Sequence, residues 1–159
     1  MYWSIFASPI GDLLLMGDGA ALTGMDFDRI PDPAWQPDDG AFDEAKDQLR
    51  AYFGGELTEF SLELAPRGTP FQQRVWSALR AIPYGTTTSY GRLAAALGDA
   101  RATRAVGSAN GRNPISIIIP CHRLIGADGS LTGYGGGMER KQWLLALEGR
   151  GRALPLVRD

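Results

Sequence analysis

The only cysteine and the only histidine of this 159-residue chain are neighbours, Cys121 and His122, in the stretch IIIPCHRLIGADG. A thiol reacts as its thiolate, and a free cysteine with a pKa of about 8.5 is only a few per cent ionised at neutral pH. A nearby base or positive charge raises that fraction, and His122 is the obvious base. Neighbouring side chains of an extended chain point to opposite sides, so proton transfer between them requires a bend at Pro120 or a bridging water.

A histidine that acts as a base usually needs a third group, often a carboxylate, to hold its ring. The candidate acids between residues 67 and 150 are few: Asp99, Asp128, Glu139 and Glu148. Glu148 is unusual because it falls at the C-terminal end of the last predicted helix, where the helix dipole disfavours a negative charge. It is therefore either an exposed helix-end residue or a functional acid. Cys121 could likewise be a small buried residue that follows a core strand.

The charge of the chain is unevenly distributed, although the formal net charge is only −2. Residues 1–66 carry 13 acidic against 3 basic side chains, whereas residues 67–127 carry 8 arginines against one acid. The arginine-rich segment indicates either a solvated basic face or an anionic partner such as nucleic acid. A single cysteine can form neither an internal disulfide nor a cysteine-rich zinc site. A cytoplasmic protein is expected, since no apolar run approaches the ~20 residues of a membrane span and no secretory signal is evident.

The first part of the chain, residues 1–66, is predicted to be a small antiparallel sheet with one helix. Three strand-like runs occupy residues 2–27, and a loop follows over 28–40. Residues 41–55 form an amphipathic helix, and residues 59–65 alternate like a strand. The helix residues expected to face the core are Phe42, Ala45, Leu49, and Tyr52 or Phe53.

The second part begins with a helix, because Thr69 is a good N-cap and Pro70 suits the first helical position. Two short helical patterns follow over 89–98 and 102–110, and their tight connection contains a glycine. This arrangement is typical of a helix-turn-helix.

The segments that surround Cys121 complete the second part, which spans residues 67–150. Residues 113–120 are predicted to form a buried strand, and Asp128-Gly129 signals a hairpin turn. Residues 138–149 form a final helix. The remainder, residues 151–159, is predicted to be a loosely held tail.

The helix predicted over 102–110 carries mostly small side chains and one arginine, Arg104. Sequence-specific reading of bases needs groups such as Arg, Asn or Gln aimed at base edges. Small residues instead allow close approach to a backbone or a narrow groove. The pattern favours DNA binding with little sequence preference, and tight packing of this face on a neighbouring helix is the alternative.

The stretch IIIPCHRLIGADGSLTGYGGG resembles the active-site segment of the methylated-DNA–protein-cysteine methyltransferases, also called O6-alkylguanine-DNA alkyltransferases. The resemblance covers residues 69–149 in order, and it includes SYG, RAVGSANGRNP, PCHR and WLLALEG, which together are highly specific. Residues 1–66 are similar only in layout. The resemblance implies an α/β (α+β) protein with an RNase H-like N-terminal domain. The C-terminal domain would be winged-helix-like, with a helix-turn-helix and the active site.

The resemblance also implies catalytic roles for five residues. Cys121 would be the nucleophile that accepts the alkyl group, and His122 would deprotonate it through a water. Glu148 would orient His122, and Asn113 would hold the active-site turn. Tyr90 would donate a proton or a hydrogen bond to the departing guanine.

Further residues would contact DNA or line the substrate pocket. Arg104 would fill the gap left in the duplex by a flipped-out guanine, and its helix would lie in the minor groove. The implied DNA-contacting residues are Tyr90, Arg92, Arg104, Ala105, Ser108 and Arg112. The implied pocket residues are Tyr134, Gly135, Gly136 and Gly137, with Arg123 bracing the site.

The implied partner is double-stranded DNA that contains O6-alkylguanine, with O4-alkylthymine as a further candidate lesion. An S-alkyl cysteine is a thioether without an easy leaving group, so each molecule would act once. No cofactor is expected, and no metal, because the zinc site of some relatives needs cysteines that this chain lacks before Cys121. A monomer is expected, with cooperative assembly on DNA left open.

Two other functions remain as alternatives. A lesion sensor or helix-turn-helix regulator would bind DNA without transferring a group, and its DNA affinity would not depend on Cys121. A Cys–His thiol hydrolase would turn over a small ester or amide, but it needs an oxyanion hole that the sequence does not reveal.

Overall fold

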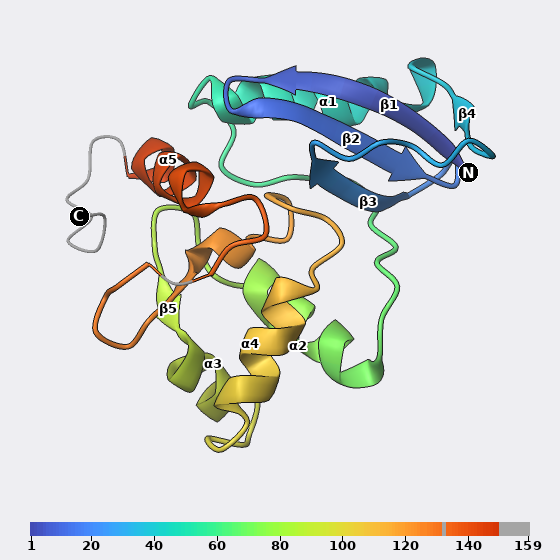
Figure 1. The fold of residues 1–159 in the computed structure, drawn as a ribbon. Helices are drawn as coiled ribbons and strands as arrows, with labels where there is room; N and C mark the ends of the chain where they lie inside the picture. Colours follow the sequence, from blue (N-terminus) through green and yellow to red (C-terminus); the bar gives the residue numbers. More distant parts are fainter. Residues whose placement is uncertain (132, 150–159) are drawn as a thin grey trace. The chain divides into compact units, whose positions relative to one another are not determined.

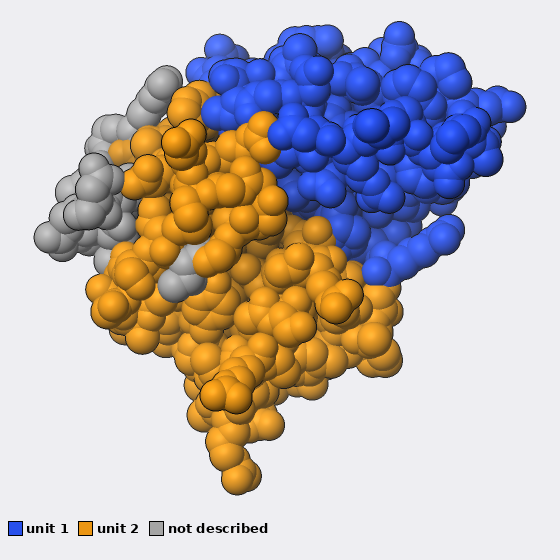
Figure 2. All heavy atoms as spheres, viewed as in Figure 1, with its two compact units in different colours: residues 1–67, 114–116 blue, residues 68–113, 117–159 orange. Residues whose placement is uncertain are grey.

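The computed structural model describes residues 1–131 and 133–149, so the predicted tail lies outside the described residues. The chain divides into two units, coloured separately in Figure 2. Residues 1–67 and 114–116 form unit 1, and residues 68–113 and 117–159 form unit 2. The predicted fold class is confirmed, since a small sheet with one helix precedes a mainly helical region. No helix among the described residues is both long enough and apolar enough to span a bilayer.

Unit 1 is built on a four-stranded sheet with the strand order β3-β2-β1-β4. Strands β1 (Tyr2–Ser8), β2 (Gly11–Gly17) and β3 (Leu22–Phe27) form the predicted antiparallel meander. The short strand β4 (Gln36–Pro37) pairs with β1 in parallel, inside the segment predicted as a loop. The sheet is therefore mixed, and the prediction of a purely antiparallel sheet is wrong at this edge.

Helix α1 (Asp43–Phe53) packs on the sheet and follows a single turn of 3-10 helix, η1 (Gly40–Phe42) (Figure 1). The Phe6 and Phe53 rings stack with their centroids 6.1 Å apart. The apolar face predicted for this helix is confirmed. All five of its members are buried: Phe42, Ala45, Leu49, Tyr52 and Phe53.

The strand predicted over residues 59–65 is wrong. Only one bridge forms there, between Leu22 and Leu64. The backbone N–H of Ser61 instead donates to the side-chain oxygen of Gln48 on α1, at 2.9 Å. A side chain of the helix thus takes a backbone donor that a sheet ladder would need.

The strand predicted over residues 113–120 is also wrong, although the segment is buried. A single bridge joins Ile115 to Met25 of β3, and the Ser116 N–H donates to the Met25 carbonyl at 3.0 Å. Ile117 then adopts φ 73°, which ends any extended conformation. The isoleucines of this segment are buried in a turn and not in a strand.

Unit 2 contains the predicted helix-turn-helix. Helix α2 (Pro70–Arg80) begins with a complete capping box formed by Thr69 and Gln72. Helices α3 (Tyr90–Ala96) and α4 (Thr103–Gly111) follow, and both α2 and α3 pack against α4. The indole of Trp76 on α2 donates to the Ala109 carbonyl of α4 at 2.9 Å.

The remaining elements of unit 2 frame the Cys–His segment. Strands β5 (Thr88–Ser89) and β6 (Leu124–Ile125) pair in parallel. Helix α5 (Met138–Glu148) ends at Gly149, as predicted. A turn forms at Asp128-Gly129, where the Gly126 N–H donates to the Ser130 carbonyl at 2.9 Å, but among the described residues around it, up to 131 and from 133, no strand pair flanks the turn. The signal there correctly indicated a turn, and within these residues the hairpin does not form.

Candidate active site

Cys121 and His122 open a single turn of 3-10 helix, η2 (Cys121–Arg123). Pro120 precedes it with φ −81° and ψ 67°, so the chain bends where a bend is required for the two side chains to cooperate. Cys121 is 6% exposed and His122 is fully buried. Neighbouring side chains point to opposite sides of an extended chain, but the backbone of Cys121 and His122 is a 3-10 turn and not extended.

The turn that carries Cys121 is strained and anchored. A β-branched residue such as Ile117 rarely adopts a positive φ, and such a conformation costs about 1–3 kcal/mol. The Asn113 side-chain amide donates to the Ile119 carbonyl at 2.7 Å, and the Cys121 N–H donates to the same carbonyl at 2.8 Å. Asn113 therefore lies where its expected role places it, on the turn that precedes the nucleophile candidate.

Glu148 lies at the centre of a buried charge cluster. It is 1% exposed, and its Oε2 lies 2.7 Å from His122 Nε2. Arg123 donates to both carboxylate oxygens, from Nε at 2.7 Å and from Nη2 at 3.0 Å. Nη1 of Arg123 donates to the Ile82 carbonyl at 2.7 Å. The acid at the unfavourable end of α5 is thus compensated by two partners, which an exposed helix-end glutamate would not have.

The electrostatics of this cluster fix the state of Glu148. Burial alone would raise its pKa, but the charge and hydrogen bond of His122, together with those of Arg123, hold the pKa well below its usual range. An ionised Glu148 accepts the Nε2 proton of His122. In the neutral imidazole, Nδ1 is then the acceptor. Nδ1 is buried and has no hydrogen-bond partner among the described residues, so its lone pair is available to a base function.

Tyr90 is the first residue of α3, and it packs against α4. A Cβ built on Gly107 would lie 3.6 Å from two carbons of the Tyr90 ring, which is ordinary contact. The Tyr90 ring therefore lies next to Gly107 of α4 and leaves room for a β-carbon at that position. The small side chains of α4 serve packing on one face, which is the alternative that the sequence had left open for this helix.

The opposite face of α4 is exposed. The predicted DNA-contacting residues of this helix and its C-cap lie there together: Arg104, Ala105, Ser108 and Arg112. Arg92 is exposed on α3. On the inward face of α4, Val106 and Ala109 are buried and belong to the core. Two arginines beside two small residues make a surface that can approach a phosphate backbone closely.

The glycine-rich segment lies directly before α5. Tyr134 is partly buried, and its carbonyl accepts from the Gly137 N–H at 2.9 Å. Gly137 has φ 94°, a conformation that a residue with a side chain rarely adopts, and it is the N-cap of α5. The segment is therefore a turn that introduces the helix bearing Glu148. Gly135 and Gly136 form its middle.

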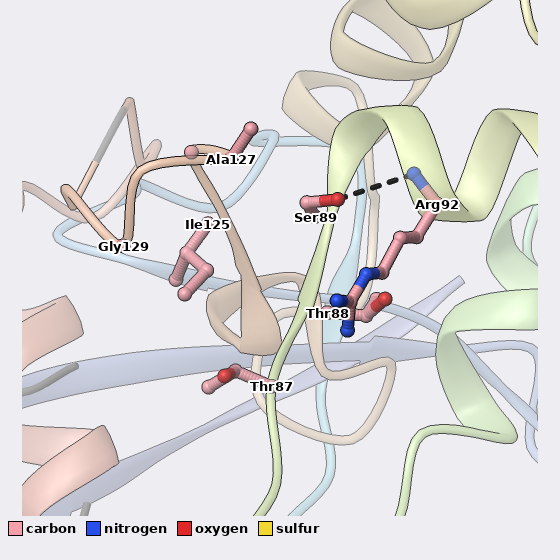
Figure 3. A pocket seen from close by; sticks show the side chains of 8 residues that line it. Thr87, Thr88, Ser89, Arg92, Ile125, Ala127 and Gly129 are labelled. Atoms are coloured by element: carbon pink, nitrogen blue, oxygen red, sulfur yellow. Dashed lines mark hydrogen bonds between the residues drawn. The ribbon is translucent and has the colours of Figure 1, made fainter. Parts of the chain in front are cut away.

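A cavity of about 260 Å³ opens between β5, the start of α3 and the loop after β6 (Figure 3). Ser89 caps α3 by accepting from the Arg92 N–H at 3.1 Å. Of this lining, only Arg92 was predicted from the sequence as a functional residue. The residues that line the cavity are Thr87, Thr88, Ser89, Arg92, Ile125, Gly126, Ala127 and Gly129.

Two groups around the site were not predicted from the sequence. Lys141 is fully buried and donates from Nζ to the Leu124 carbonyl at 2.7 Å, although a lysine in a polar stretch of helix usually faces solvent. The Ile82 carbonyl, which receives Arg123, had no signal at all. A signal for Lys141 does exist: it lies seven residues before Glu148, which puts both on the same side of a helix. No cluster of three potential metal ligands occurs within residues 1–131 and 133–149.

Comparison with protein families assigns both parts of the chain. Residues 1–66 match the model for the 6-O-methylguanine DNA methyltransferase, ribonuclease-like domain. Residues 70–150 match the model for the 6-O-methylguanine DNA methyltransferase, DNA binding domain.

Individual relatives agree with the family models. The methylated-DNA–protein-cysteine methyltransferase of Mycobacterium tuberculosis (strain ATCC 25618 / H37Rv) is 57% identical over 152 residues, which cover 93% of this chain and 92% of the relative. That of Methanosarcina acetivorans is 52% identical over 155 residues, covering 94% and 99%. A crystal structure of Mycobacterium tuberculosis OGT in complex with DNA superimposes with a TM-score of 0.91 at 55% identity, covering 99% of this chain and 98% of that one.

Proposed function

The chain belongs to the 6-O-methylguanine DNA methyltransferase family, and on that basis we propose that it moves an alkyl group from O6 of guanine in duplex DNA to Sγ of Cys121. It is a DNA-repair enzyme of the methylated-DNA–protein-cysteine methyltransferase class, and DNA is its partner. The observation that carries the assignment of residues is the buried cluster of His122, Arg123 and Glu148 beside the only thiol of the chain.

Activation of the thiol is the first step of the proposed mechanism. Glu148 holds His122 through Nε2, which leaves Nδ1 as the acceptor. Nδ1 takes the Cys121 proton through a bridging water, and the resulting imidazolium is stabilised by the anionic Glu148. Arg123 keeps Glu148 ionised and in position, so it acts through the acid and not on the substrate.

Transfer is an in-line displacement at the alkyl carbon. The Cys121 sulfur forms a bond to that carbon, the bond from the carbon to guanine O6 breaks, and the electron pair leaves with the guanine. Tyr90 donates a proton or a hydrogen bond to the departing base and so offsets its developing negative charge. The product thioether has no easy leaving group, so one molecule repairs one lesion.

Access to the O6 atom requires the base to leave the stack, which costs a few kcal/mol. The exposed face of α4 enters the minor groove, and Arg104 occupies the vacated position in the duplex. Arg92 and Arg112 hold the backbone through phosphate contacts, which position the protein without reading sequence. Tyr134 and Gly135–Gly137 form the wall of the base pocket. The protein acts as a monomer on O6-alkylguanine, and O4-alkylthymine is a further substrate.

This function is tested by mixing the protein with a short duplex that contains one O6-methylguanine and then measuring the mass of the intact protein. The expected result is a gain of one methylene mass, located on Cys121 by peptide mapping and absent with an undamaged duplex. A folded protein that binds this duplex without gaining mass would be a lesion sensor, and the transfer mechanism would be rejected.

A further inference from the structure

Lysine is rare in this chain and one of its two copies is buried at the active site. The only lysines are Lys46 and Lys141, whereas the other basic residues are 14 arginines. Lys141 has no exposed surface. A buried ammonium group is costly unless an opposite charge or a set of hydrogen bonds compensates it. Its position therefore calls for a reason beyond helix formation.

Helix α5 directs two charged side chains to the same short segment. Glu148 contacts His122 and Arg123 within η2. Lys141, two helical turns earlier, donates to the carbonyl of Leu124, the residue that directly follows η2. The segment that begins with Cys121 is thus contacted by both an acid and a base from one helix.

The cluster contains two basic side chains, Arg123 and Lys141, and one acidic side chain, Glu148. Glu148 forms an ion pair with Arg123 and also contacts His122. Lys141 donates to the neutral carbonyl of the residue that directly follows the Cys121–Arg123 turn, so a thiolate on that turn places an opposite charge near the ammonium group. Burial lowers the pKa of Lys141 to about 8, and the charge of Cys121 acts in the opposite direction and raises it, which agrees with that placement.

We propose that Lys141 is a positioning residue that supplies the positive charge which keeps Cys121 ionised before DNA arrives. Lysine suits this role because its charge is compact and lies at the end of a flexible stem. The charge favours loss of the thiol proton, and it acts together with His122, which takes that proton. A purely structural lysine would only tie α5 to β6 through the Leu124 carbonyl. Since Cys121 is the nucleophile under the proposed function, the catalytic meaning of Lys141 rests on that function.

The pH dependence of Cys121 alkylation by iodoacetamide, followed by intact mass, separates the two roles. Cys121 is the only thiol, so every adduct reports on it. The variants are Lys141→Gln, which retains a donor without the charge, and Lys141→Arg, which retains the charge. Arg140→Gln is the matched control, because it removes a charge from the adjacent, partly exposed position of α5.

In Lys141→Gln we expect the pH of half-maximal reaction to rise by about one unit, as for loss of one nearby opposite charge. Lys141→Arg should restore most of that shift, and Arg140→Gln should leave the profile unchanged. An unchanged profile in Lys141→Gln overturns the proposal, as does a shift of equal size in Arg140→Gln. The reaction needs no DNA, so a failure of methyl transfer from O6-methylguanine would reject the proposed function separately.

A measurement on the unsubstituted protein covers the case in which Lys141→Gln does not fold. With 13Cε-labelled lysine, only Lys46 and Lys141 give signals, and Lys46 serves as the internal control. Blocking Cys121 with methyl methanethiosulfonate removes the thiolate. The proposal expects the pKa of Lys141 to fall on blocking while that of Lys46 stays the same. An unchanged Lys141 titration overturns it.

Discussion

The cluster around η2 and the exposed face of α4 belong to the same unit but are built on opposite principles. The cluster buries three charged side chains, Arg123, Lys141 and Glu148, within hydrogen-bond distance of fixed partners. The face of α4 exposes Arg104 and Arg112 beside the small Ala105 and Ser108. Buried charges act through geometry and low dielectric, whereas exposed charges act through their number and are screened by salt. The first region is suited to chemistry and the second to holding DNA, so substitutions in the two should separate rate from affinity.

Cys121→Ser should have the largest effect on methyl transfer and should separate it most clearly from DNA affinity. We expect complete loss of methyl transfer, because a serine hydroxyl cannot replace a thiolate at neutral pH. Affinity for duplex DNA should stay within about twofold, since Cys121 is buried and the α4 face is unchanged. Intact mass and fluorescence anisotropy on the same samples measure both. Loss of DNA affinity in this variant would mean that the two regions are not separable.

Glu148→Gln should damage the cluster both as a structure and as a catalyst. Removal of one partner of a buried ion pair costs about 3–5 kcal/mol, because the other charge remains buried. Urea unfolding at neutral pH measures this loss. Single-turnover transfer, measured where the variant is still folded, should also be slower, because His122 loses the group that orients it. The outcome against this account is a variant with unchanged stability and an unchanged rate.

The same carboxylate predicts an acid limb in the stability of the protein. The pKa of Glu148 is lower in the folded than in the unfolded chain, where the ordinary value is 4.5. Its contribution is therefore present above pH 4.5 and is lost as the pH falls below it, because the unfolded chain then binds a proton that the folded chain does not. As the pH is lowered from 7 to 3, the free energy of unfolding should fall more steeply in the unsubstituted protein than in Glu148→Gln. Parallel curves would contradict this.

Arg104→Ala should affect the DNA side alone. Filling the vacated stack offsets part of the few kcal/mol that base flipping costs, so transfer from duplex DNA should slow by about tenfold to a hundredfold. The free energy of unfolding should change by less than about 0.5 kcal/mol, because the residue is exposed. Stopped-flow transfer kinetics and urea unfolding test the two halves of this prediction. A large loss of stability would place Arg104 in the core of the fold.

Lys141 should produce an alkaline effect with the same sign of slope as the acid limb, because its pKa is also lowered in the folded chain. Its pKa of about 8 in the folded chain lies below the ordinary 10.5. Between these values the unfolded chain holds a proton that the folded chain has released, so stability rises with pH in that window, at about 1.4 kcal/mol per unit of pKa difference. Unfolding of Lys141→Met should lack this rise. If the variant shows the same slope between pH 8 and 10.5, Lys141 is not the group responsible.

The salt dependence of DNA binding should show the smallest effect. Each phosphate contact removed from the α4 face should reduce the slope of log affinity against log salt by about one. Arg112→Ala and Arg92→Ala should therefore each lower the slope slightly, whereas Arg80→Ala on α2 serves as a matched arginine control. Titrations at three salt concentrations suffice. An equal change in the control would mean that the arginines act through total charge and not through contacts.

The sequence predicted the helices better than the short extended segments. Helix α2 was located by Thr69 and Pro70, and the apolar face of α1 followed from its periodicity. Burial was correctly predicted for the four isoleucines at 115 and 117–119, but the strand was not, because an apolar run cannot distinguish a buried strand from a buried turn. The positive φ of Ile117 has no signal in the residue type.

Residues of the candidate site could be predicted from the sequence where their type or position was unusual. Cys121 and His122 stood out as single reactive residues, and Glu148 as an acid at the wrong end of a helix. Lys141 and the Ile82 carbonyl did not, since a lysine in a polar helix usually faces solvent and a backbone group has no identity of its own. Their roles depend on distances across the fold, up to 41 residues apart in the chain for Arg123 and Ile82.

The most direct test of this division compares two reactions of the same thiol in Glu148→Gln and Arg104→Ala. One reaction is methyl transfer from O6-methylguanine in a duplex, and the other is alkylation by iodoacetamide without DNA. We predict that Glu148→Gln slows both reactions, because it alters the thiol itself, and that Arg104→Ala slows only transfer from the duplex. An Arg104→Ala protein that is equally slow with iodoacetamide, or a Glu148→Gln protein that reacts normally in both, would contradict the separation of chemistry from DNA binding.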